Sequence, residues 1–414
     1  MMQVDTMRAI DRWLGIPLTF LLTLYRKVVD VLQRSTAARP RRILFIELSE
    51  MGSTILADPA MRKARRELGA ELYFVIFRKN RASLDLTGTI PASHVFTLRE
   101  NSLFTLLLDT CRFLAWTRRR NIDTVIDLEL FSRFTALLSG LSGAKNRVGF
   151  HAFHNEGLYR GGLLTHRVWY NPHMHIAKNF IALVNSLLAE HVQVPYSKTS
   201  IPDSEITLRQ QTISSQRLQE MKRLISKHAA GYRPESSRLI LINPNASDLL
   251  PQRRWERNRY IELIRRILAE TADTLVLITG APGEKEEAEA MCRTVDNDRC
   301  VNFAGAVALQ ELPALYSLAT LMVSNDSGPG HFSAVTSLPT FILFGPETPT
   351  LYGSLGNSIP IYAGLACSPC VSAANHRKTP CTDNRCLQAI SVDQVFEAIR
   401  PILLQGENPP CRPA

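Results

Sequence analysis

The chain lacks any apolar run near its start that is long enough to cross a membrane. The stretch WLGIPLTFLLTLY at 13–25 carries no charge but falls short of the about 20 apolar residues that a transmembrane helix needs. It also lacks the small-residue cleavage site of a secretory signal peptide. With 45% hydrophobic and 21% charged residues, the composition excludes collagenous and disordered classes. A chain of 414 residues can hold two domains, each with its own core.

Negative charge is scarce at the start, where residues 1–42 hold eight Lys or Arg against three Asp, in a chain of net charge +10. A basic segment indicates an anionic partner, and the rest of the chain does not interleave aromatic with basic residues as a nucleic-acid surface would. We therefore expect no nucleic acid and favour a membrane surface, contacted through residues 7–34. Apolar residues recur there at helical spacing and predict an amphipathic helix, which lies either on the membrane or on the protein's own body. These residues are Met7, Ile10, Leu14, Leu18, Leu21, Tyr25, Val28 and Leu32.

Four of the eight cysteines lie within a short C-terminal segment, Cys367, Cys370, Cys381 and Cys386. Their spacing could hold a structural zinc, but free or buried thiols are the favoured interpretation, and no other metal site is expected. Without a secretion signal, the cysteines indicate a reducing, cytoplasmic setting rather than a disulfide framework.

Expected strands and helices alternate in two successive runs, which predicts parallel sheets covered on both faces. The first run has strands at 41–46, 71–77, 94–98 and 124–129, and a helix at 54–68 despite Pro59. The second has strands at 239–245, 274–280, 300–305, 321–326 and 340–345. A polar, proline-containing segment near 195–205 separates the runs. Ligands are expected in a cleft between the two units, beyond the carboxyl ends of the strands.

The segment at 324–331, SNDSGPGH, carries the sharpest motif, because a strand there ends in polar residues and small residues open a helix. Backbone N–H groups at a helix start attract phosphate, although an ordinary capped turn has the same pattern. Arg253 and Arg254 after the strand at 239–245 could neutralise a diphosphate or lie on the surface. Glu284 could accept hydrogen bonds from a ribose or cap its own helix.

Several segments together make the chain resemble glycosyltransferase family 9, the heptosyltransferases of the lipopolysaccharide inner core. They are ILFIELSEMGSTILADPAMRKAR, DTVIDLELFSRFTALLSGLSGAKNRVGF, INPNASDLLPQRRWERNRYIELIRRI, ITGAPGEKEE, VNFAGAVALQELPALYSLATLMVSNDSGPGHFSA and LFGPETPTLYGSLG, in the family's order. The resemblance implies a GT-B fold of two Rossmann-like domains facing a central cleft, here with an extra N-terminal amphipathic helix. The expected divisions are a helix at 1–40, an acceptor domain at 41–200, a nucleotide-sugar domain at 201–400 and a tail at 401–414.

The resemblance also implies roles for individual residues in binding a nucleotide-sugar donor such as ADP-heptose. Asp326, Ser327, Gly328 and His331 would contact its diphosphate and sugar, with Asp326 accepting hydrogen bonds from sugar hydroxyls. Arg253 would bind phosphate, and Glu284 would face the ribose or base. Asn245, with Ala246, matches a pair of hydroxyl residues in some members. No metal would be needed, because positive side chains and helix N-termini would stabilise the leaving nucleotide.

One departure from the family concerns the general base. The family's N-terminal loop usually reads Gly-Asp, whereas this chain has Ser53 in place of the aspartate, and a serine hydroxyl needs a base of its own. Glu50 on the same loop is the first candidate, and Asp58 and Glu47 are the other nearby carboxylates. The resulting hypothesis is an inverting transferase that moves heptose to a glycolipid or lipopolysaccharide acceptor, peripheral on the inner face of the cytoplasmic membrane.

Two alternatives stay open. One is a transferase that uses another nucleotide sugar for capsule or another glycan, and the other is a non-catalytic sugar-nucleotide-binding protein. A Rossmann dehydrogenase is disfavoured, because ELSEMGS follows the first strand where a G-x-G-x-x-G turn would stand.

Overall fold

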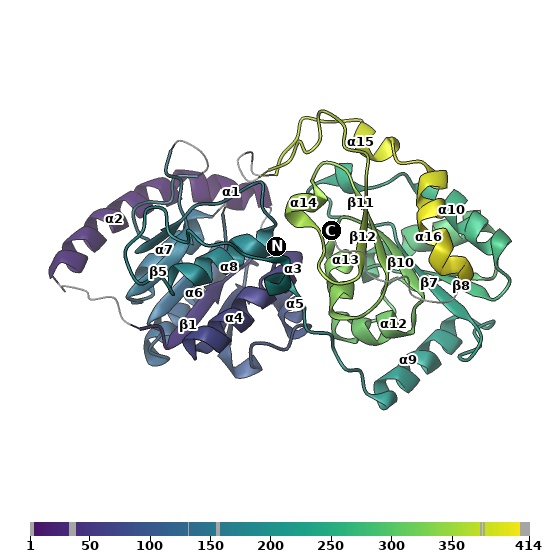
Figure 1. Cartoon of the computed structure of the whole chain (residues 1–414), viewed down its shortest axis with the longest axis horizontal. Helices are drawn as coiled ribbons and strands as arrows, with labels where there is room; N and C mark the ends of the chain where they lie inside the picture. Colours follow the sequence, from purple (N-terminus) through teal and green to yellow (C-terminus); the bar gives the residue numbers. More distant parts are fainter. Residues whose placement is uncertain are drawn as a thin grey trace. The chain divides into compact units, whose positions relative to one another are not determined.

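The computed structural model describes residues 4–32, 39–130, 132–154, 158–372, 375 and 377–405. The chain divides into two compact units, Met1–Thr207 and Leu208–Ala414, each built around its own six-stranded sheet (Figure 1). All the strand pairs of both sheets are parallel. The α/β class expected from the alternation of strands and helices is therefore confirmed.

The N-terminal sheet has the strand order β3-β2-β1-β4-β5-β6. Its strands are β1 (Arg42–Ile46), β2 (Glu71–Phe77), β3 (Val95–Leu98), β4 (Thr124–Asp127), β5 (Asn146–Phe150) and β6 (His166–Val168). The helices of this unit are α1 (Val4–Trp13), α2 (Gly15–Leu32), α3 (Met51–Leu56), α4 (Asp58–Leu68), α5 (Arg81–Asp85), α6 (Leu103–Arg119), α7 (Arg133–Leu141) and α8 (Ile176–Ser186).

Both faces of this sheet are covered. Leu44 and Ile46 of β1 pack on one face against Phe113 of α6 and Leu138 of α7. The alternate residues of β1 point to the other face and are fully buried as well. Helices α4 and α8 contact each other. Helix α2 packs against α7 (Figure 1).

Prolines divide two helices that the periodicity predicts as continuous. Pro59 stands in the first turn of α4, and a break at Ala57 separates α4 from α3. Pro17 stands in the first turn of α2, so the single N-terminal helix expected over 1–40 is in fact α1 and α2. The cause is the proline ring, which removes an N–H donor and clashes with the carbonyl four residues earlier. Residues 1–3 and 33–38 of the expected helix lie outside the described residues, as do 406–414 of the expected tail.

The C-terminal sheet has the order β12-β11-β10-β7-β8-β9. Its strands are β7 (Arg238–Asn243), β8 (Thr274–Ile278), β9 (Cys300–Asn302), β10 (Leu321–Asn325), β11 (Thr340–Phe344) and β12 (Ser358–Tyr362). The helices are α9 (Ser215–His228), α10 (Arg257–Glu270), α11 (Lys285–Val295), α12 (Leu312–Leu318), α13 (Gly328–Phe332), α14 (Pro349–Tyr352), α15 (Arg385–Gln388) and α16 (Val392–Gln405).

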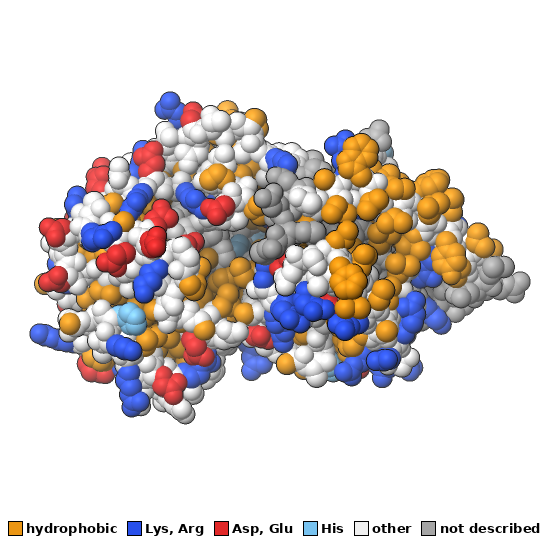
Figure 2. Space-filling model, turned by 180° about the vertical axis from the view of Figure 1, so that it is seen from behind, with side chains coloured by type: hydrophobic (Ala, Val, Ile, Leu, Met, Phe, Trp, Pro, Cys, Tyr) orange, Lys and Arg blue, Asp and Glu red, His pale blue; other side chains and the backbone are white. Residues whose placement is uncertain are grey.

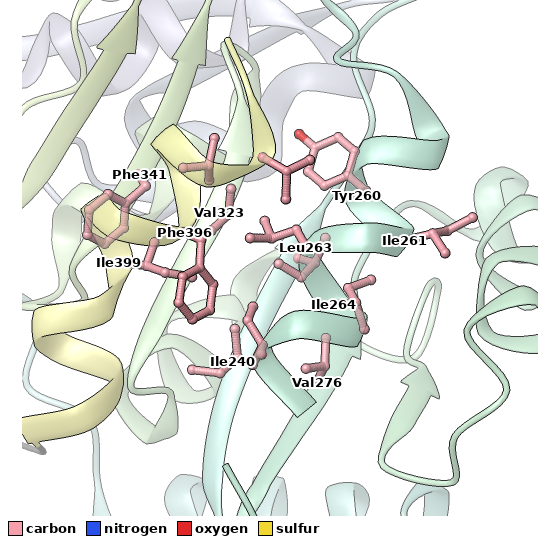
Figure 3. Packing of buried hydrophobic residues seen from close by; sticks show 14 of the residues in the cluster. Ile240, Tyr260, Ile261, Leu263, Ile264, Val276, Val323, Phe341, Phe396 and Ile399 are labelled. Carbon is pink, nitrogen blue, oxygen red and sulfur yellow. The ribbon is translucent and has the colours of Figure 1, made fainter. Parts of the chain in front are cut away.

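Helices α10 and α16 lie side by side on one face of this sheet and close a hydrophobic core (Figure 3). Leu263 and Ile264 of α10 and Phe396 of α16 are fully buried against Ile240 and Val323 of the strands. Sequence periodicity did not identify α8, α9 or α16. Within the described residues, no helix is both long and apolar enough to cross a membrane.

Candidate functional site

Each sheet has one point where the order of its strands reverses. In the N-terminal unit the chain leaves β1 toward β2 and β3, then returns to β4 on the other side of β1. In the C-terminal unit β7 and β10 are neighbours in the same way. Ligands of open parallel sheets bind beyond the carboxyl ends of the strands at such reversals. Of the predicted donor residues, Glu284 follows β8 and the others follow β7 or β10, the two strands at the reversal. The predicted catalytic loop follows β1, at the reversal of the N-terminal unit.

Asp326, the first residue after β10, lies in a buried cluster of four charges. Its Oδ2 is 3.5 Å from Nε of Arg253, whose Nη2 is 2.6 Å from Oε2 of Glu347. Glu347 follows β11, and its Oε1 is 3.4 Å from Nε of Arg377. The guanidinium of Arg377 also lies over the ring of Tyr352, 4.5 Å from its centroid. Two arginines therefore balance two carboxylates at this edge of the sheet.

Three buried atoms of this cluster have no hydrogen-bond partner within the described part of the chain: Arg253 Nε, Asp326 Oδ2 and Glu347 Oε1. Buried polar atoms nearly always have a partner, so these atoms are available to a ligand or to water. Burial raises the pKa of Asp326 to about 7, although the positive charge of Arg253 opposes the rise. The cluster offers a hydrogen-bond acceptor, a titratable carboxyl group and a cationic donor, which is chemistry suited to a hydroxylated anion.

Asn245 and Glu284, also predicted to bind the donor, approach each other over Gly280. A Cβ atom on Gly280 would lie 2.7 Å from both Nδ2 of Asn245 and Oε2 of Glu284, so only glycine leaves room for them. The carboxylate of Glu284 accepts a hydrogen bond of 2.6 Å from the backbone N–H of Ala281. Burial raises the pKa of Glu284. Glu284 therefore caps its own turn, whatever else it binds.

The short segment after Asp326 is held by packing as well as by its turn. The hydroxyl of Ser327 donates to the carbonyl of Asn325 at 3.2 Å. A Cβ on Gly328 would lie 2.9 Å from the ring of Phe332, so the absence of a side chain there serves internal packing. Helix α13, which carries His331, is only five residues long. This explanation of Gly328 needs no ligand.

Asn325 joins the two strands at the reversal and has a structural role. Its side-chain oxygen accepts from the N–H of Trp255 at 3.1 Å and from the hydroxyl of Tyr260 at 2.9 Å. Its Nδ2 donates to the carbonyl of Pro244 at 2.7 Å, in the loop that follows β7. One amide thus fixes α10 and the loop after β7 relative to Asp326.

Sequence reasoning missed two members of the charged cluster, Glu347 and Arg377. Glu347 belongs to the segment LFGPETPTLYGSLG, which contributes to the family resemblance but whose carboxylate was given no role. Arg377 belongs to the cysteine-containing segment and has no local signal. Of the two adjacent arginines, Arg253 enters the cluster, whereas Arg254 donates to the carbonyl of Ala246 at 2.6 Å and holds that loop.

In the N-terminal unit, the loop between β1 and α3 places Glu50, the first candidate base, beside Ser53. The hydroxyl of Ser53 donates to Oε2 of Glu50 at 2.8 Å. Glu129, which follows β4, accepts from the N–H of Leu48 at 3.0 Å and from the hydroxyl of Ser49 at 2.9 Å. The backbone N–H of Glu50 in turn donates to Oε1 of Glu47 at 3.2 Å. Carboxylates from two neighbouring strands therefore position the loop and its glutamate.

These carboxylates repel one another. Burial, with the charges of Glu129 and Glu50 adding to it, raises the pKa of Glu47 well above its ordinary value. Burial and the charge of Glu50 likewise raise the pKa of Glu129. Glu47 and Glu129 are both buried, whereas Glu50 is only partly so. Perturbed carboxyl groups gathered at a strand end are typical of catalytic sites.

Asp58, the second candidate base, is held by other groups of its own unit. Its Oδ2 is 2.8 Å from Nε of Arg62, and its Oδ1 accepts a hydrogen bond from the hydroxyl of Thr89. It is buried, and burial raises its pKa. Both carboxylate oxygens of Asp58 therefore already have partners within the unit.

Arg160 joins the loops after β4 by hydrogen bonds. It pairs with Asp127 and donates to the carbonyls of Glu129 and Ser132. Its guanidinium thus neutralises a fully buried carboxylate beneath the loop that carries Glu129.

The C-terminal segment carries four cysteines, Cys367, Cys370, Cys381 and Cys386. Within the described residues, no three His, Cys, Asp or Glu side chains are placed to hold a metal ion. Cys370 receives a hydrogen bond from the hydroxyl of Thr379, whereas Cys386 is buried beside Gly345. The backbone N–H of Cys370 donates to the carbonyl of Pro346 at 3.0 Å, which ties this segment to the turn that carries Glu347.

The chain folds into two α/β units, each with an all-parallel sheet. In each unit, charged side chains with shifted pKa values lie where the strand order reverses. Two such units are the architecture of GT-B glycosyltransferases. The family model described as Glycosyltransferase family 9 (heptosyltransferase) matches residues 112–379, which is more than half of the chain. The chain belongs to this family.

Individual relatives are more distant. Lipooligosaccharide heptosyltransferase 2 of Campylobacter jejuni is 25% identical over 174 residues, which is 40% of this chain and 51% of that protein. The match thus spans about half of that relative's length. Lipopolysaccharide heptosyltransferase 1 of Escherichia coli O18:K1:H7 is 22% identical over 77% of this chain and 90% of its own. Among solved structures, E. coli ADP-heptose lps heptosyltransferase II superposes with a TM-score of 0.66 at 19% identity, covering 89% of this chain and all of that one. The structural likeness confirms the fold.

Proposed function

We propose that this protein transfers heptose from ADP-heptose to a lipopolysaccharide-core or related glycolipid acceptor, with inversion at the anomeric carbon. The observation that carries the proposal is the charged cluster of Asp326, Arg253 and Glu347 in a chain of the heptosyltransferase family. The relatives whose names mention ADP-heptose and lipopolysaccharide support this choice of donor and acceptor.

The donor would use the atoms of the cluster that have no hydrogen-bond partner within the described part of the chain. Asp326 Oδ2 would accept a hydrogen bond from a sugar hydroxyl, and Arg253 Nε would donate to a phosphate oxygen. Ser327, Gly328 and His331 are proposed to lie along the diphosphate and sugar. Asn245 and Glu284, which meet over Gly280, are proposed to face the ribose or base. This binding needs no metal, because a buried guanidinium supplies positive charge where the leaving nucleotide gains negative charge.

The chemical step is a single displacement. Glu50 takes the proton of the acceptor hydroxyl as that oxygen forms its bond to the anomeric carbon, and the bond from the anomeric carbon to the phosphate oxygen breaks. ADP leaves with the electron pair of that bond. Ser53, whose hydroxyl donates to Glu50, orients the carboxylate rather than acting as a base itself. Glu47 and Glu129 hold the loop in place.

The acceptor's lipid portion places the reaction at the inner face of the cytoplasmic membrane, to which we propose the protein binds peripherally through its N-terminal region. The proposed division of labour follows the family pattern, with acceptor binding at 41–200 and donor binding at 201–400.

Calorimetric binding of ADP-heptose, GDP-mannose and UDP-glucose tests the donor assignment. Wild type should bind ADP-heptose selectively, and Asp326→Asn should weaken that binding at least about tenfold, the effect of about 1.4 kcal/mol lost from one or two hydrogen bonds. Asp248→Asn, a change of an exposed carboxylate in the same unit, is the matched control and should bind as wild type does.

The other outcomes separate the alternatives. Selective binding of another donor keeps the fold and changes the substrate. Transfer to deacylated core acceptors is measured by mass spectrometry. Binding of ADP-heptose without transfer to any of these acceptors favours a non-catalytic binding protein. No binding to any nucleotide sugar contradicts the proposal.

A further inference from the structure

Helices α1 and α2 are attached to the N-terminal unit by polar contacts. Asp11 accepts from the backbone N–H groups of Arg133 and Phe134 at 2.9 Å, at the start of α7. Thr23 accepts from the N–H of Gly162 at 2.9 Å, and Asp30 pairs with Arg147 at 2.9 Å. A surface helix of a globular protein normally does the opposite and buries its apolar side. Here the polar side faces the body.

One apolar side of α2 is left outside. Every large apolar residue of the stripe from Leu14 to Val28 that predicts the helix is exposed, whereas Leu22 and Val29 of the same helix are half-buried. The exposed residues are Trp13, Leu14, Ile16, Leu18, Phe20, Leu21, Leu24, Tyr25, Val28 and Val31, with exposed fractions from 41% to 76%. Helix α2 packs on α7 with one side, as expected if it lies on the protein's own body, and leaves the stripe open on the other.

A second helix adds to this surface although it is distant in the sequence. Leu103, Phe104, Leu107 and Leu108 of α6 are exposed too, and α6 contacts α7 as α2 does. Fourteen of the 22 exposed large hydrophobic residues in the described chain belong to Trp13–Val31 or to 103–108. Figure 2 shows hydrophobic side chains gathered in a broad field over this unit, with Lys and Arg along its lower edge. We call these fourteen residues the α2/α6 surface.

The charges beside the α2/α6 surface have one sign. On α2 and α6 the exposed charged side chains are Lys27, Arg112, Arg118 and Arg119, all basic. The carboxylates of Asp30 and Asp109 on the same helices are paired with arginines. An apolar field of this size is rare on a protein that remains free in water, and a basic rim selects an anionic partner.

We propose that the α2/α6 surface docks on an anionic lipid bilayer, with the apolar side chains in the headgroup region and the basic rim against lipid phosphates. This docking does not depend on which sugar is transferred. It gives α6 a role that neither the α6 sequence nor the proposed reaction requires. A two-fold pairing with a second copy is less suited to this face, because it would bring the basic rims together. A bilayer neutralises them.

Sedimentation of the full chain with vesicles tests this docking. Wild type should bind vesicles of phosphatidylethanolamine and phosphatidylglycerol and should bind phosphatidylcholine vesicles at least tenfold more weakly. Leu21→Glu on α2 and Leu107→Glu on α6 should each weaken binding to the anionic vesicles at least about tenfold, because a charge replaces a leucine of the docked face. Lys27→Gln should weaken it about fivefold, which corresponds to the about 1 kcal/mol of one basic residue near anionic lipid.

Val192→Glu is the matched control, since Val192 is an exposed apolar residue of the same unit outside the α2/α6 surface, and it should bind as wild type does. Equal binding to phosphatidylcholine, or full binding by Leu107→Glu, overturns the proposal. The proposal is also overturned if the wild type binds no vesicle and instead forms a concentration-dependent dimer in analytical ultracentrifugation that Leu21→Glu abolishes. ADP-heptose binding and transfer to a water-soluble acceptor should be unchanged in both leucine variants, so failure here is distinct from failure of the proposed reaction.

Discussion

Replacing Arg253 by methionine would leave two buried carboxylates without the cation between them. Arg253 lies 3.5 Å from Asp326 and 2.6 Å from Glu347, and the two acidic side chains are 5% and 2% exposed. At such burial, removing one partner of an ion pair costs about 3–5 kcal/mol of unfolding free energy. Arg377 also pairs with Glu347 and tempers the loss there, so we expect a value near 3 kcal/mol at pH 8.

The loss should depend on pH, and its sign follows from the pKa of Asp326. Burial raises that pKa from the ordinary 3.8 to about 7, so the folded protein holds a proton that the unfolded chain has released. Wild-type stability therefore falls as pH rises between these two values. Without Arg253 the folded-state pKa rises further, and protonation at lower pH relieves the variant. The destabilisation should be largest at pH 8 and clearly smaller at pH 5.5.

Urea unfolding at both pH values, followed by tryptophan fluorescence, measures the difference, since Trp255 is buried in the same unit. Arg254→Met is the matched control. Arg254 pairs with Asp248, whose side chain is 96% exposed, so its loss should cost only about 1 kcal/mol, mostly from its bond to Ala246, and should not depend on pH in this range. A loss below about 1 kcal/mol for Arg253→Met, or a loss of equal size at both pH values, would refute the reasoning.

Three further predictions follow from other parts of the molecule. Glu50→Gln should lower kcat about 10²–10⁴-fold, while its affinity for ADP-heptose in calorimetry stays unchanged. Ser53→Ala should lower kcat less. Full activity of Glu50→Gln together with no activity of Asp58→Asn would show that the base is misassigned. Asn325→Leu should lower the free energy of unfolding in urea by about 2 kcal/mol or more, because the hydroxyl of Tyr260 and the backbone N–H of Trp255 lose a buried acceptor. Asn357→Leu, which removes an exposed hydrogen bond, should cost under about 1 kcal/mol. Equal losses would contradict the structural role of Asn325. Gly69→Ala should cost about 1–2 kcal/mol of unfolding free energy, because Gly69 has a positive φ. Gly356→Ala should cost more, because Gly356 also has a positive φ and its Cβ would lie 2.9 Å from the carbonyl oxygen of Ala334. Thermal melts that give the same loss of stability for both variants would be evidence against this contact.

The local sequence pattern was sufficient to predict the strands near the two sites. β1, β7, β8, β10 and β11 are short apolar runs followed by polar or small residues, and the structure has a strand at each of them. Strands buried on both faces read as continuous apolar segments, and the residues that follow them mark the carboxyl end. The family resemblance added the order of these segments along the chain. The pattern was weaker in 150–205, where α8 and β6 have no strong local signal.

The N-terminal segment separates the two sources of information most clearly. Its sequence determined that residues from Leu14 to Val28 form one apolar side of a helix, since helical periodicity depends only on spacing. It did not determine which side the body would take. That choice depended on Asp11, Thr23 and Asp30 finding donors on residues more than a hundred positions away, among them Arg133 and Arg147.

The sequence by itself determined the α/β class, the family, and the strand ends that carry Glu50 and Asp326, because these are properties of short segments and of their order. The tertiary structure alone decided which charges meet: that Arg253 and not Arg254 joins Asp326, that Glu347 and Arg377 complete the cluster, and that Glu129 holds the loop of Glu50. Such pairings act at a few ångströms between residues far apart in the chain, and only folding brings them within that distance.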